Sequence, residues 1–406
     1  MTHEYDVLIV GGGLVGASLA CALGARGLRV AVVEAVPLKS DQQPSYDDRT
    51  LALAQGSRRI FDALGLWEAL RPGVTPIHTI HTSDRGHFGF TRLHREEEGV
   101  EALGYVAPAR VLGAVLGPRL EALAGVDLVC PARLRHFEVD AAGVNVTLGL
   151  EDGTRVLRGR LLVAADGSQS RVREALDIAT VQRTYGQTAL IANISPQLPH
   201  RNIAYERFTD TGPLALLPMS EGRCSLVWTL RDDQVDEVLQ LPDAAFLARL
   251  QERFGQRLGR LQRVGARHAY PLSLVRARES VRPRVALIGN ALHTLHPVAG
   301  QGFNLGLRDV AVLAELLVDA QAAGQDIGEL ALLQRYADWR GVDHRRVIAF
   351  TDGVVRLFSN PLAPVVCLRD AGMLALDLLP PAKRLFGQLT MGRAGRLPRL
   401  ARGLPL

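Results

Sequence analysis

The first 35 residues of the chain alternate between apolar runs and a glycine-rich turn. Tyr5–Val10 (YDVLIV) is an apolar run that predicts a buried, central parallel strand. Residues 14–25 then have the spacing of a helix, and Arg29–Glu34 (RVAVVE) predicts a second strand. The order strand, helix, strand predicts a βαβ unit at the very start of the chain.

The pattern stays mixed up to about residue 180. Helices are predicted for residues 51–70 and 109–123, and buried strands for 126–130 and 161–165. Antiparallel pairing is predicted for a hairpin over 77–91, which turns at 84–86, and for a meander over 133–156.

From about residue 187 the pattern changes to short strands in succession, which predicts a separate antiparallel sheet. These strands are 189–194, 203–208, 212–218 and 224–230. A buried strand follows at 285–289, a long helix begins near Gln301, and the chain beyond Asp326 is predicted to be helical up to a basic tail.

These elements predict an α/β fold in which one domain is interrupted by another and resumes after it. A Rossmann-like domain is expected to comprise residues 1–76, 101–180 and 276–325. The inserted antiparallel-sheet domain, expected to bind the substrate, comprises residues 77–100 and 181–275. Residues 326–406 form a helical C-terminal region with the basic tail.

The glycine-rich turn has the GxGxxG spacing of a dinucleotide site. Gly11, Gly13 and Gly16, with Leu14 and Val15, lie between the first strand and the first helix. Glycines there allow a tight turn and a close approach of the backbone to a pyrophosphate at the helix N-terminus. Glu34 ends the next strand, where a carboxylate can accept a hydrogen bond from a ribose. A purely structural turn is the alternative interpretation.

Two later segments also place polar groups where buried strands end. Asp166-Gly167 follows the strand at 161–165, with Arg173 a few residues later. Gly289-Asn290 ends the strand at 285–289 and is followed by His293, His296-Pro297 and a glycine-rich turn into a helix. The carboxyl ends of parallel strands are where α/β proteins bind ligands, so these segments are candidates for the same site as the first turn.

Together the three segments resemble the class A flavoprotein monooxygenases, the group of para-hydroxybenzoate hydroxylase, and most closely the ubiquinone-biosynthesis hydroxylases. The resemblance extends over essentially the whole chain. It implies bound FAD and a para-hydroxybenzoate hydroxylase type of FAD domain. The residues implied to contact FAD beyond the first turn and Glu34 are Arg49, Arg110, Asp166, Gly167, Arg173, Gly289, Asn290, Gly300, Gln301, Gly302 and Asn304.

One position departs from most of that family, which has Gly-Asp where this chain has Gly289-Asn290. Asparagine keeps an oxygen that can accept from a ribityl hydroxyl but loses the charge, so FAD binding is expected to survive. The Gly-Asn pair resembles the branch of the 2-octaprenyl-6-methoxyphenol hydroxylases.

The resemblance implies a reaction in which NAD(P)H binds transiently, reduces the flavin and leaves. Oxygen then reacts to form a flavin C4a-hydroperoxide that hydroxylates a polyprenylated phenol. His293 and His296 are candidates to accept the phenol proton, with the ordering of a turn as the other interpretation of His296. Pro297 and Gly300 are expected to shape the backbone beside the flavin ring. The candidate substrate contacts in the sheet domain are Tyr205, Met219 and Trp228.

The amino-acid composition indicates the cellular environment of the protein and the partners it can have. Four cysteines without metal-ligand spacing predict no metal site and a reducing, cytoplasmic environment. The net charge of +5 is mild, but no acidic residue follows Asp377, whereas six basic residues do. This tail is either solvated or contacts an anionic membrane surface or a ubiquinone-biosynthesis complex. Nucleic acid is not expected, because the tail has almost no aromatic residues for stacking.

Two other functions fit the same sequence. A flavin-dependent reductase of prenyl double bonds would use FAD without transferring oxygen. A non-catalytic flavin-binding subunit of a lipid-biosynthesis complex would need neither oxygen nor a nicotinamide. Labelled oxygen in the product separates the first from a hydroxylase, and substrate-stimulated NAD(P)H oxidation separates the second.

Overall fold

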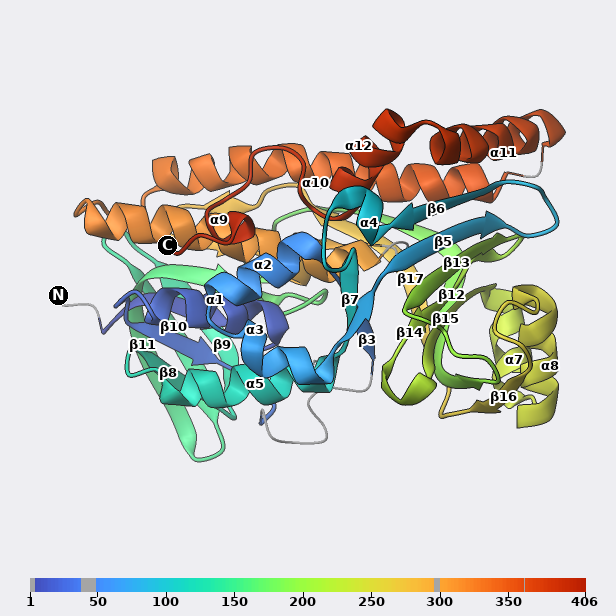
Figure 1. Ribbon diagram of the computed structural model, residues 1–406. Coiled ribbons are helices and arrows are strands. Elements are labelled where there is room, and N and C mark those ends of the chain that lie inside the picture. Colours follow the sequence, from blue (N-terminus) through green and yellow to red (C-terminus); the bar gives the residue numbers. More distant parts are fainter. Residues whose placement is uncertain (1–3, 38–48, 296–299, 361) are drawn as a thin grey trace.

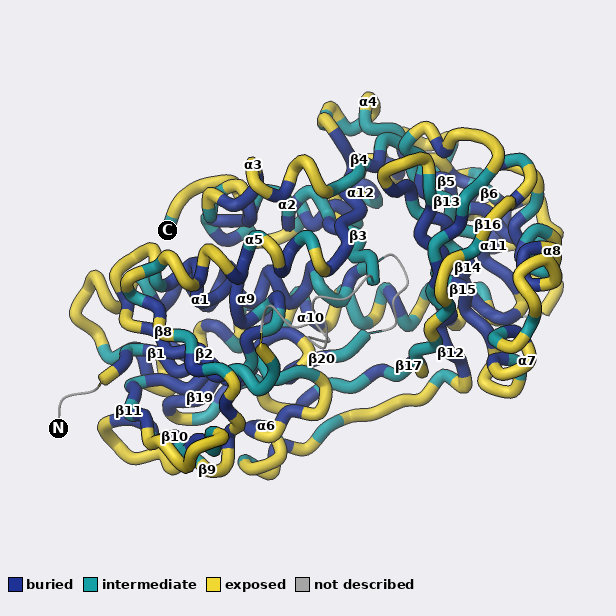
Figure 2. The backbone as a smooth tube through the Cα atoms, turned by 90° about the horizontal axis from the view of Figure 1, so that it is seen from below, coloured by how far each residue is buried: buried dark blue, intermediate teal, exposed yellow. Residues whose placement is uncertain are grey.

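A computed structural model describes residues 4–37, 49–295, 300–360 and 362–406. It has two lobes, each built around a sheet, and α10 (Leu330–Phe358) runs along both of them (Figure 1). The long strands β12 (Thr180–Pro196) and β17 (His268–Ala277) lead from one lobe to the other (Figure 2). The predicted fold class, a Rossmann-like domain with an inserted sheet domain and a helical C-terminal region, is confirmed.

The first lobe contains an eight-stranded sheet with the order β18-β19-β11-β1-β2-β8, extended by β10 and β9. Strand β1 pairs in parallel with β2 and with β11, and β19 and β8 continue the parallel pairing outward. The strands are β1 (Tyr5–Val10), β2 (Val30–Val33), β8 (Val126–Val129), β9 (Arg133–Val139), β10 (Val144–Leu150), β11 (Gly153–Ala164), β18 (Val281–Arg282) and β19 (Val285–Leu287).

Successive side chains of β1 point to opposite faces of the sheet, so this lobe has two hydrophobic cores. Val7 and Ile9 pack against three helices, and Leu8 and Val10 pack against the β9–β10 meander. Because both faces are covered, the strand is apolar almost throughout, as the sequence predicted. The three helices are α1 (Leu14–Gly24), α5 (Ala109–Ala122) and α9 (Gln301–Ala322).

The second lobe contains a nine-stranded sheet with the order β20-β17-β12-β15-β14-β13-β5-β6, and β16 pairs with β12. One face packs against α7 (Val235–Gln240) and α8 (Asp243–Phe254), which the sequence analysis did not predict. The remaining strands are β5 (Thr79–Asp84), β6 (Phe90–His94), β13 (Ile203–Thr209), β14 (Gly212–Pro218), β15 (Cys224–Arg231), β16 (Leu261–Val264) and β20 (His293–Thr294).

Two predictions about these lobes were wrong. The helix predicted from residue 51 begins at Gln55, because Thr50–Ala54 forms β3, which pairs with β7 (Gly104–Pro108) in a small sheet that also contains β4 (Thr75–Ile77). Pairing with distant strands overrides local helical spacing there. The inserted sheet is also not wholly antiparallel, because β5 lies parallel to β13.

The short helices are α2 (Gln55–Ala63), α3 (Trp67–Leu70), α4 (Arg95–Glu98) and α6 (Arg171–Ala175).

The C-terminal region consists of α10, α11 (Ala363–Leu378) and α12 (Pro380–Thr390), followed by a segment that returns to the first lobe. Leu400 and Ala401 are buried there. Two cations of the predicted basic tail have acidic partners within the protein: Lys383 pairs with Glu97, and Arg399 pairs with Glu315 and Asp319. The tail is therefore packed on the protein over much of its length. In the part of the chain that is described, no helix is both long and apolar enough to span a membrane.

Candidate active site

The first glycine-rich turn connects β1 to α1 and leaves the start of that helix open. Gly11 has φ +104°, and a Cβ at Gly16 would overlap the carbonyl oxygen of Gly11. Helix α1 begins after Gly13 without a side-chain cap, so its first amides are available to an anion. Glu34 accepts hydrogen bonds from the amides of Gly12 (2.7 Å) and Val36 (2.9 Å), which holds its carboxylate beside the turn.

The second segment presents a buried carboxylate at the end of β11. Asp166 Oδ2 accepts from the amide of Val172 (3.3 Å), and Oδ1 is buried with no hydrogen-bond partner among the described residues. Burial raises the pKa of this carboxyl, against the hydrogen bonds from Ser170 and Val172 that lower it. An unpaired buried acceptor suits a ligand that brings a hydroxyl or amide donor.

Arg173 connects this segment to the third one. Its guanidinium donates to the carbonyl oxygens of Ala291 (2.8 Å) and Ser168 (2.7 Å). Gly289, in the turn after β19, has φ +57°, and a Cβ there would be 3.1 Å from Val15 of α1. The predicted segments, far apart in sequence, are therefore in contact at one edge of the first sheet.

All three segments border one cavity of about 930 Å³ between the two lobes. Its wall includes Gly13–Val15 at the start of α1, Gly167, Gly289-Asn290, and Gly300–Asn304 at the start of α9. Helix α9 also begins at a glycine, Gly300 (φ +60°), without a side-chain cap. Two open helix N-termini thus face the same cavity, as expected for a site that holds a phosphorylated cofactor.

Comparisons with known proteins agree with this arrangement. Residues 4–351 match the family model described as an FAD binding domain. Ubiquinone hydroxylase UbiL of Rhodospirillum rubrum is 44% identical over 404 residues, covering 99% of this chain and 93% of its own. The 3-demethoxyubiquinol 3-hydroxylase of Escherichia coli K12 is 31% identical, covering 97% and 100%. The chain belongs to the ubiquinone-biosynthesis hydroxylases.

Solved structures support the same fold. The p-nitrophenol 4-monooxygenase PnpA of Pseudomonas putida superposes with a TM-score of 0.80, at 20% identity, over 98% of this chain and 100% of its own. The predicted family, its cofactor FAD and its class of enzyme, an FAD-dependent monooxygenase, are confirmed.

The residues around the cavity fit FAD. The open N-terminus of α1 and its glycines would hold the pyrophosphate, Glu34 the adenosine ribose, and Asp166 Oδ1 a donor of the cofactor. Arg49 and Asn290 also line the cavity, and the Arg49 guanidinium lies 5.2 Å from the centre of the Tyr270 ring. Arg110 is exposed at the start of α5, whereas its neighbour Ala109 lines the cavity.

Asn304 also makes hydrogen bonds within the protein that the sequence did not reveal. Its Oδ1 accepts from Ala54 N (2.8 Å) and Ser57 Oγ (2.7 Å), and its Nδ2 donates to Ala52 O (2.8 Å) and Gly300 O (2.7 Å). The first three of these bonds attach β3 and α2 to the start of α9, and the fourth lies within that start. Asn304 therefore holds together two segments that border the cavity.

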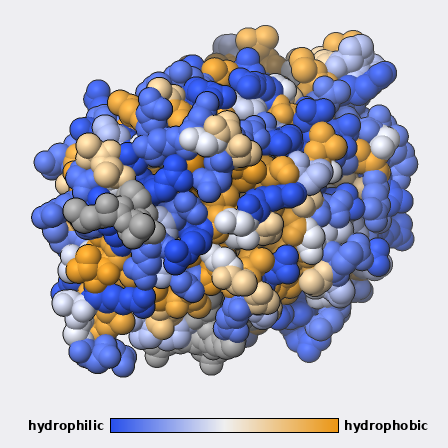
Figure 3. Space-filling model, turned by 90° about the vertical axis from the view of Figure 1, so that its left-hand side faces the viewer, coloured by the Kyte–Doolittle hydropathy of each residue, from blue (hydrophilic) through white to orange (hydrophobic). Residues whose placement is uncertain are grey.

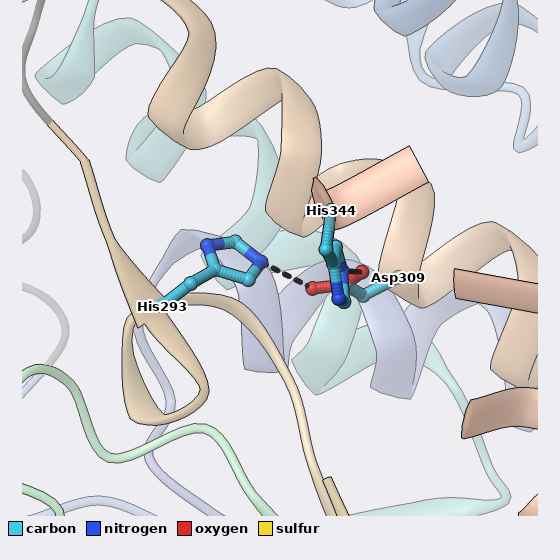
Figure 4. A group of neighbouring side chains, drawn as sticks. All are labelled: His293, Asp309 and His344. Atoms are coloured by element: carbon cyan, nitrogen blue, oxygen red, sulfur yellow. Dashed lines mark hydrogen bonds and ion pairs between the residues drawn. The ribbon is translucent and has the colours of Figure 1, made fainter. Parts of the chain in front are cut away.

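His293 lies behind the cavity wall, in a cluster centred on Asp309 (Figure 4). Its Nε2 is 2.8 Å from Asp309 Oδ2, and from the other side His344 Nε2 is 2.7 Å from Oδ1. Arg340 donates to Oδ1 (2.7 Å) and the Gly289 amide donates to Oδ2 (3.1 Å). His293 does not line the cavity, whereas Thr294 and Leu295 do.

The Asp309 cluster has the composition of a metal site but the charges of an ion-pair network. His293, Asp309 and His344 offer ligand atoms within 4.8 Å of one another. The Arg340 guanidinium already donates to the same carboxylate, and a cation added there would meet its positive charge at close range. The cluster is better explained as a structural link. It attaches the Gly289 turn, which borders the cavity, to α9 and α10. Of its side chains, only that of His293 was predicted to belong to the site.

The cluster predicts a dependence of stability on pH. Burial lowers the pKa of His344 to about 4, against the raising effect of Asp309. The unfolded chain takes up this proton near pH 6.5, whereas the native protein does not, so stability should fall as pH falls from about 6.5 to about 4. Thermal unfolding across that range should show the loss, and His344→Gln, which keeps an N–H but does not titrate, should give a shallower slope. Equal slopes would contradict the assignment.

Of the predicted substrate contacts, Tyr205 lies in the cavity wall, whereas Trp228 and Met219 lie elsewhere. Trp228 packs against Phe246 of α8, on the other face of the sheet. Its neighbours in β15, Val227 and Thr229, face the cavity instead, as strand alternation requires. His296 and Pro297 lie outside the described residues. Gly300, the first residue described after them, lines the cavity.

The C-terminal helices form a part of the cavity wall that was not predicted from the sequence. Phe350, Val354, Leu357 and Phe358 of α10 line the cavity at helical spacing, a signal that the sequence contains. Further residues come from α11 and α12, namely Leu368, Arg369, Gly372, Met373, Leu376, Phe386 and Thr390. The region beyond residue 326 is thus part of the site.

Proposed function

We propose that this protein hydroxylates the aromatic ring of a prenylated phenol during ubiquinone synthesis, with O2 and NAD(P)H as co-substrates. Relatives that match nearly the whole chain are named as ubiquinone hydroxylases and as a 3-demethoxyubiquinol 3-hydroxylase, which supports this substrate class. The assignment to the branch of the 2-octaprenyl-6-methoxyphenol hydroxylases stays a prediction.

The proposal rests on the difference between two parts of the cavity: one is lined by helix N-termini and the other by apolar side chains. At one end are the open starts of α1 and α9, which suit the cofactor. At the other end the wall is formed by side chains such as Val354, Leu357, Met373 and Leu376, which suit an isoprenoid chain. A ring beside the start of α9 and a tail between the C-terminal helices and the second sheet would fill both parts.

FAD, when bound, supplies the transfer of electrons from NAD(P)H and the activation of oxygen. The chain's own residues would bind the ring, orient it and exclude water. Thr229 and Thr294 both line the cavity, and each has a buried hydroxyl oxygen without a hydrogen-bond partner among the described residues. Either hydroxyl could bind the phenol oxygen, whereas His293 is held by Asp309.

The direct test is to incubate the FAD-loaded protein with prenylphenols, NADH or NADPH, and labelled O2. The expected result is substrate-stimulated oxidation of the nicotinamide and a product heavier by one labelled oxygen atom. An unlabelled, reduced prenyl chain would instead indicate the reductase. Stable FAD binding with no stimulated oxidation for any prenylphenol would indicate the non-catalytic subunit.

The tail site can be tested separately through Leu376. Leu376→Asn places an amide in the apolar wall, so kcat/KM for a long-tailed phenol should fall roughly tenfold, the equivalent of losing part of one buried leucine contact. The value for a tail-free phenol should change little. Leu330→Asn, at the start of α10, is the matched control, because Leu330 is exposed and does not line the cavity. Equal losses for both substrates would place the tail elsewhere.

A further inference from the structure

The outer face of α11 and α12 is unusual for a protein surface in water. Seven of the fifteen exposed large apolar side chains of the described chain lie between residues 357 and 389. Leu368 and Leu378 are 74% and 75% exposed, and the other leucines of this face, Leu362, Leu379, Leu385 and Leu389, are at least half exposed. We call these six residues the leucine face; its helices lie on the outside of the molecule (Figure 1).

The charged side chains of α11 lie on its inner side, away from the leucine face. Arg369 and Asp370 are buried, and Arg369 pairs with Asp84 of β5 and donates to the carbonyl oxygen of Leu357. Asp377 accepts from the amide of Arg92 (2.7 Å). Every exposed residue from 362 to 382 is uncharged. A helix at a water-exposed surface normally has the opposite arrangement, and the buried ion pair keeps α11 in this orientation.

The opposite end of the molecule shows the usual surface. There, at the outer side of the first lobe, hydrophilic residues cover most of the face, and apolar residues form groups between them (Figure 3). Exposed apolar side chains gathered on two neighbouring helices, as on α11 and α12, mark a site of contact with another apolar phase.

The leucine face is continuous with the cavity. Leu368 is exposed and also lines the cavity, and the same is true of Gly372 one turn further on. On the inner side of the same two helices, Met373, Leu376 and Phe386 form the cavity wall. A lipid could therefore pass from the outer face to the inner wall of these helices over mostly apolar residues, since Arg369, which also lines the cavity, is buried and paired with Asp84.

The cavity behind the leucine face indicates what covers it. Arg384 is exposed on α12 next to Leu385, and the glutamates of α4 lie beside the same helix, where Glu97 pairs with Lys383. A leucine-rich face that is continuous with a cavity suited to an isoprenoid chain matches the interface of a lipid bilayer, where leucines enter the acyl region and Arg384 meets the headgroups.

We propose that α11 and α12 dock by the leucine face on a lipid bilayer, and that the cavity receives its substrate from that bilayer. The second part rests on the proposed function, since a prenylated phenol dissolves in the membrane. The first part does not. Contact with the bilayer is assigned to these helices, and the packed C-terminal segment beyond residue 391 is not required for it.

The test is sedimentation of the FAD-loaded, full-length protein with vesicles of phosphatidylcholine and phosphatidylglycerol, and with phosphatidylcholine alone. The double variant Leu378→Ser/Leu385→Ser removes two exposed leucines that do not line the cavity. Its affinity for the mixed vesicles should fall at least about tenfold, with FAD content unchanged. The matched control is Val156→Ser/Leu330→Ser, which removes two exposed apolar side chains elsewhere and should bind as the wild type does.

The outcomes separate the proposal from its rivals. Equal binding by the double variant and the wild type would overturn it. So would a wild-type dimer that the double variant dissociates while neither binds vesicles, because a second copy would then cover the leucine face. Vesicle binding does not depend on turnover, so a failure of the proposed hydroxylation would leave this result intact. Where turnover is seen, the double variant should lose activity on a long-tailed phenol in vesicles and keep it on a soluble one.

Discussion

Gly16→Ala is expected to yield a folded but colourless protein. A Cβ at residue 16 would overlap the carbonyl oxygen of Gly11, which belongs to the backbone and cannot rotate away as a side chain would. The turn must open, and the amides at the start of α1 move from the position that a pyrophosphate needs. We expect FAD affinity to fall by on the order of 100-fold, about 2.7 kcal/mol, and activity to fall with it.

Flavin absorbance after gel filtration and titration of the apoprotein with FAD measure this effect. The matched control is Gly117→Ala in α5, where a Cβ meets nothing within 4 Å. That variant should keep FAD and gain up to about 1 kcal/mol of stability, because alanine favours the helix. If Gly16→Ala purified with a full complement of FAD, the cofactor could not depend on this turn.

Asp309→Asn is expected to cause the largest loss of stability among single substitutions at the site. The carboxylate is fully buried, and four groups converge on it: the Gly289 amide, His293, Arg340 and His344. Burial raises its pKa, but the positive charge of Arg340 and the hydrogen bond with His293 hold the pKa well below the ordinary value. Asparagine leaves Arg340 without its counter-charge and brings an amide that must donate where partners already donate. The expected loss is about 3–5 kcal/mol.

Urea unfolding of the apoprotein and the holoprotein measures this loss, and an FAD titration shows whether the Gly289 turn moves. Asp319→Asn is the matched control, because Asp319 lies on the same helix, is exposed and forms a surface pair with Arg399. Surface pairs contribute up to about 1 kcal/mol, so the control should be close to the wild type. A similar small loss in Asp309→Asn would show that the cluster does not hold the turn.

Much of the cofactor side of the site could be predicted from the sequence. The turn at Gly11–Gly16 and Glu34 lie within one βαβ unit, where spacing along the chain determines position in space. The ends of β11 and β19 were also predicted, because apolar runs that stop at polar residues mark buried parallel strands. These local patterns carried the family resemblance that the comparisons confirmed.

The substrate side was less predictable, for a physical reason. Alternation along β15 shows that Val227 and Trp228 face opposite sides, but not which side meets α8 and which meets the cavity. His293 likewise has no partner near it in sequence, because Asp309 and His344 come from two later helices. A pattern along one segment cannot specify which distant segment packs on it.

By itself, the sequence determined the βαβ unit, the glycine turn and membership of a family of FAD-dependent hydroxylases, because these depend on spacing within single segments. Only the tertiary structure decided that the C-terminal helices complete the cavity, that Asp309 joins three elements behind it, and that α11 turns its charges inward. Those features depend on which surfaces meet, and burial of an ion pair such as Arg369 with Asp84 selects one packing among several that the apolar pattern allows.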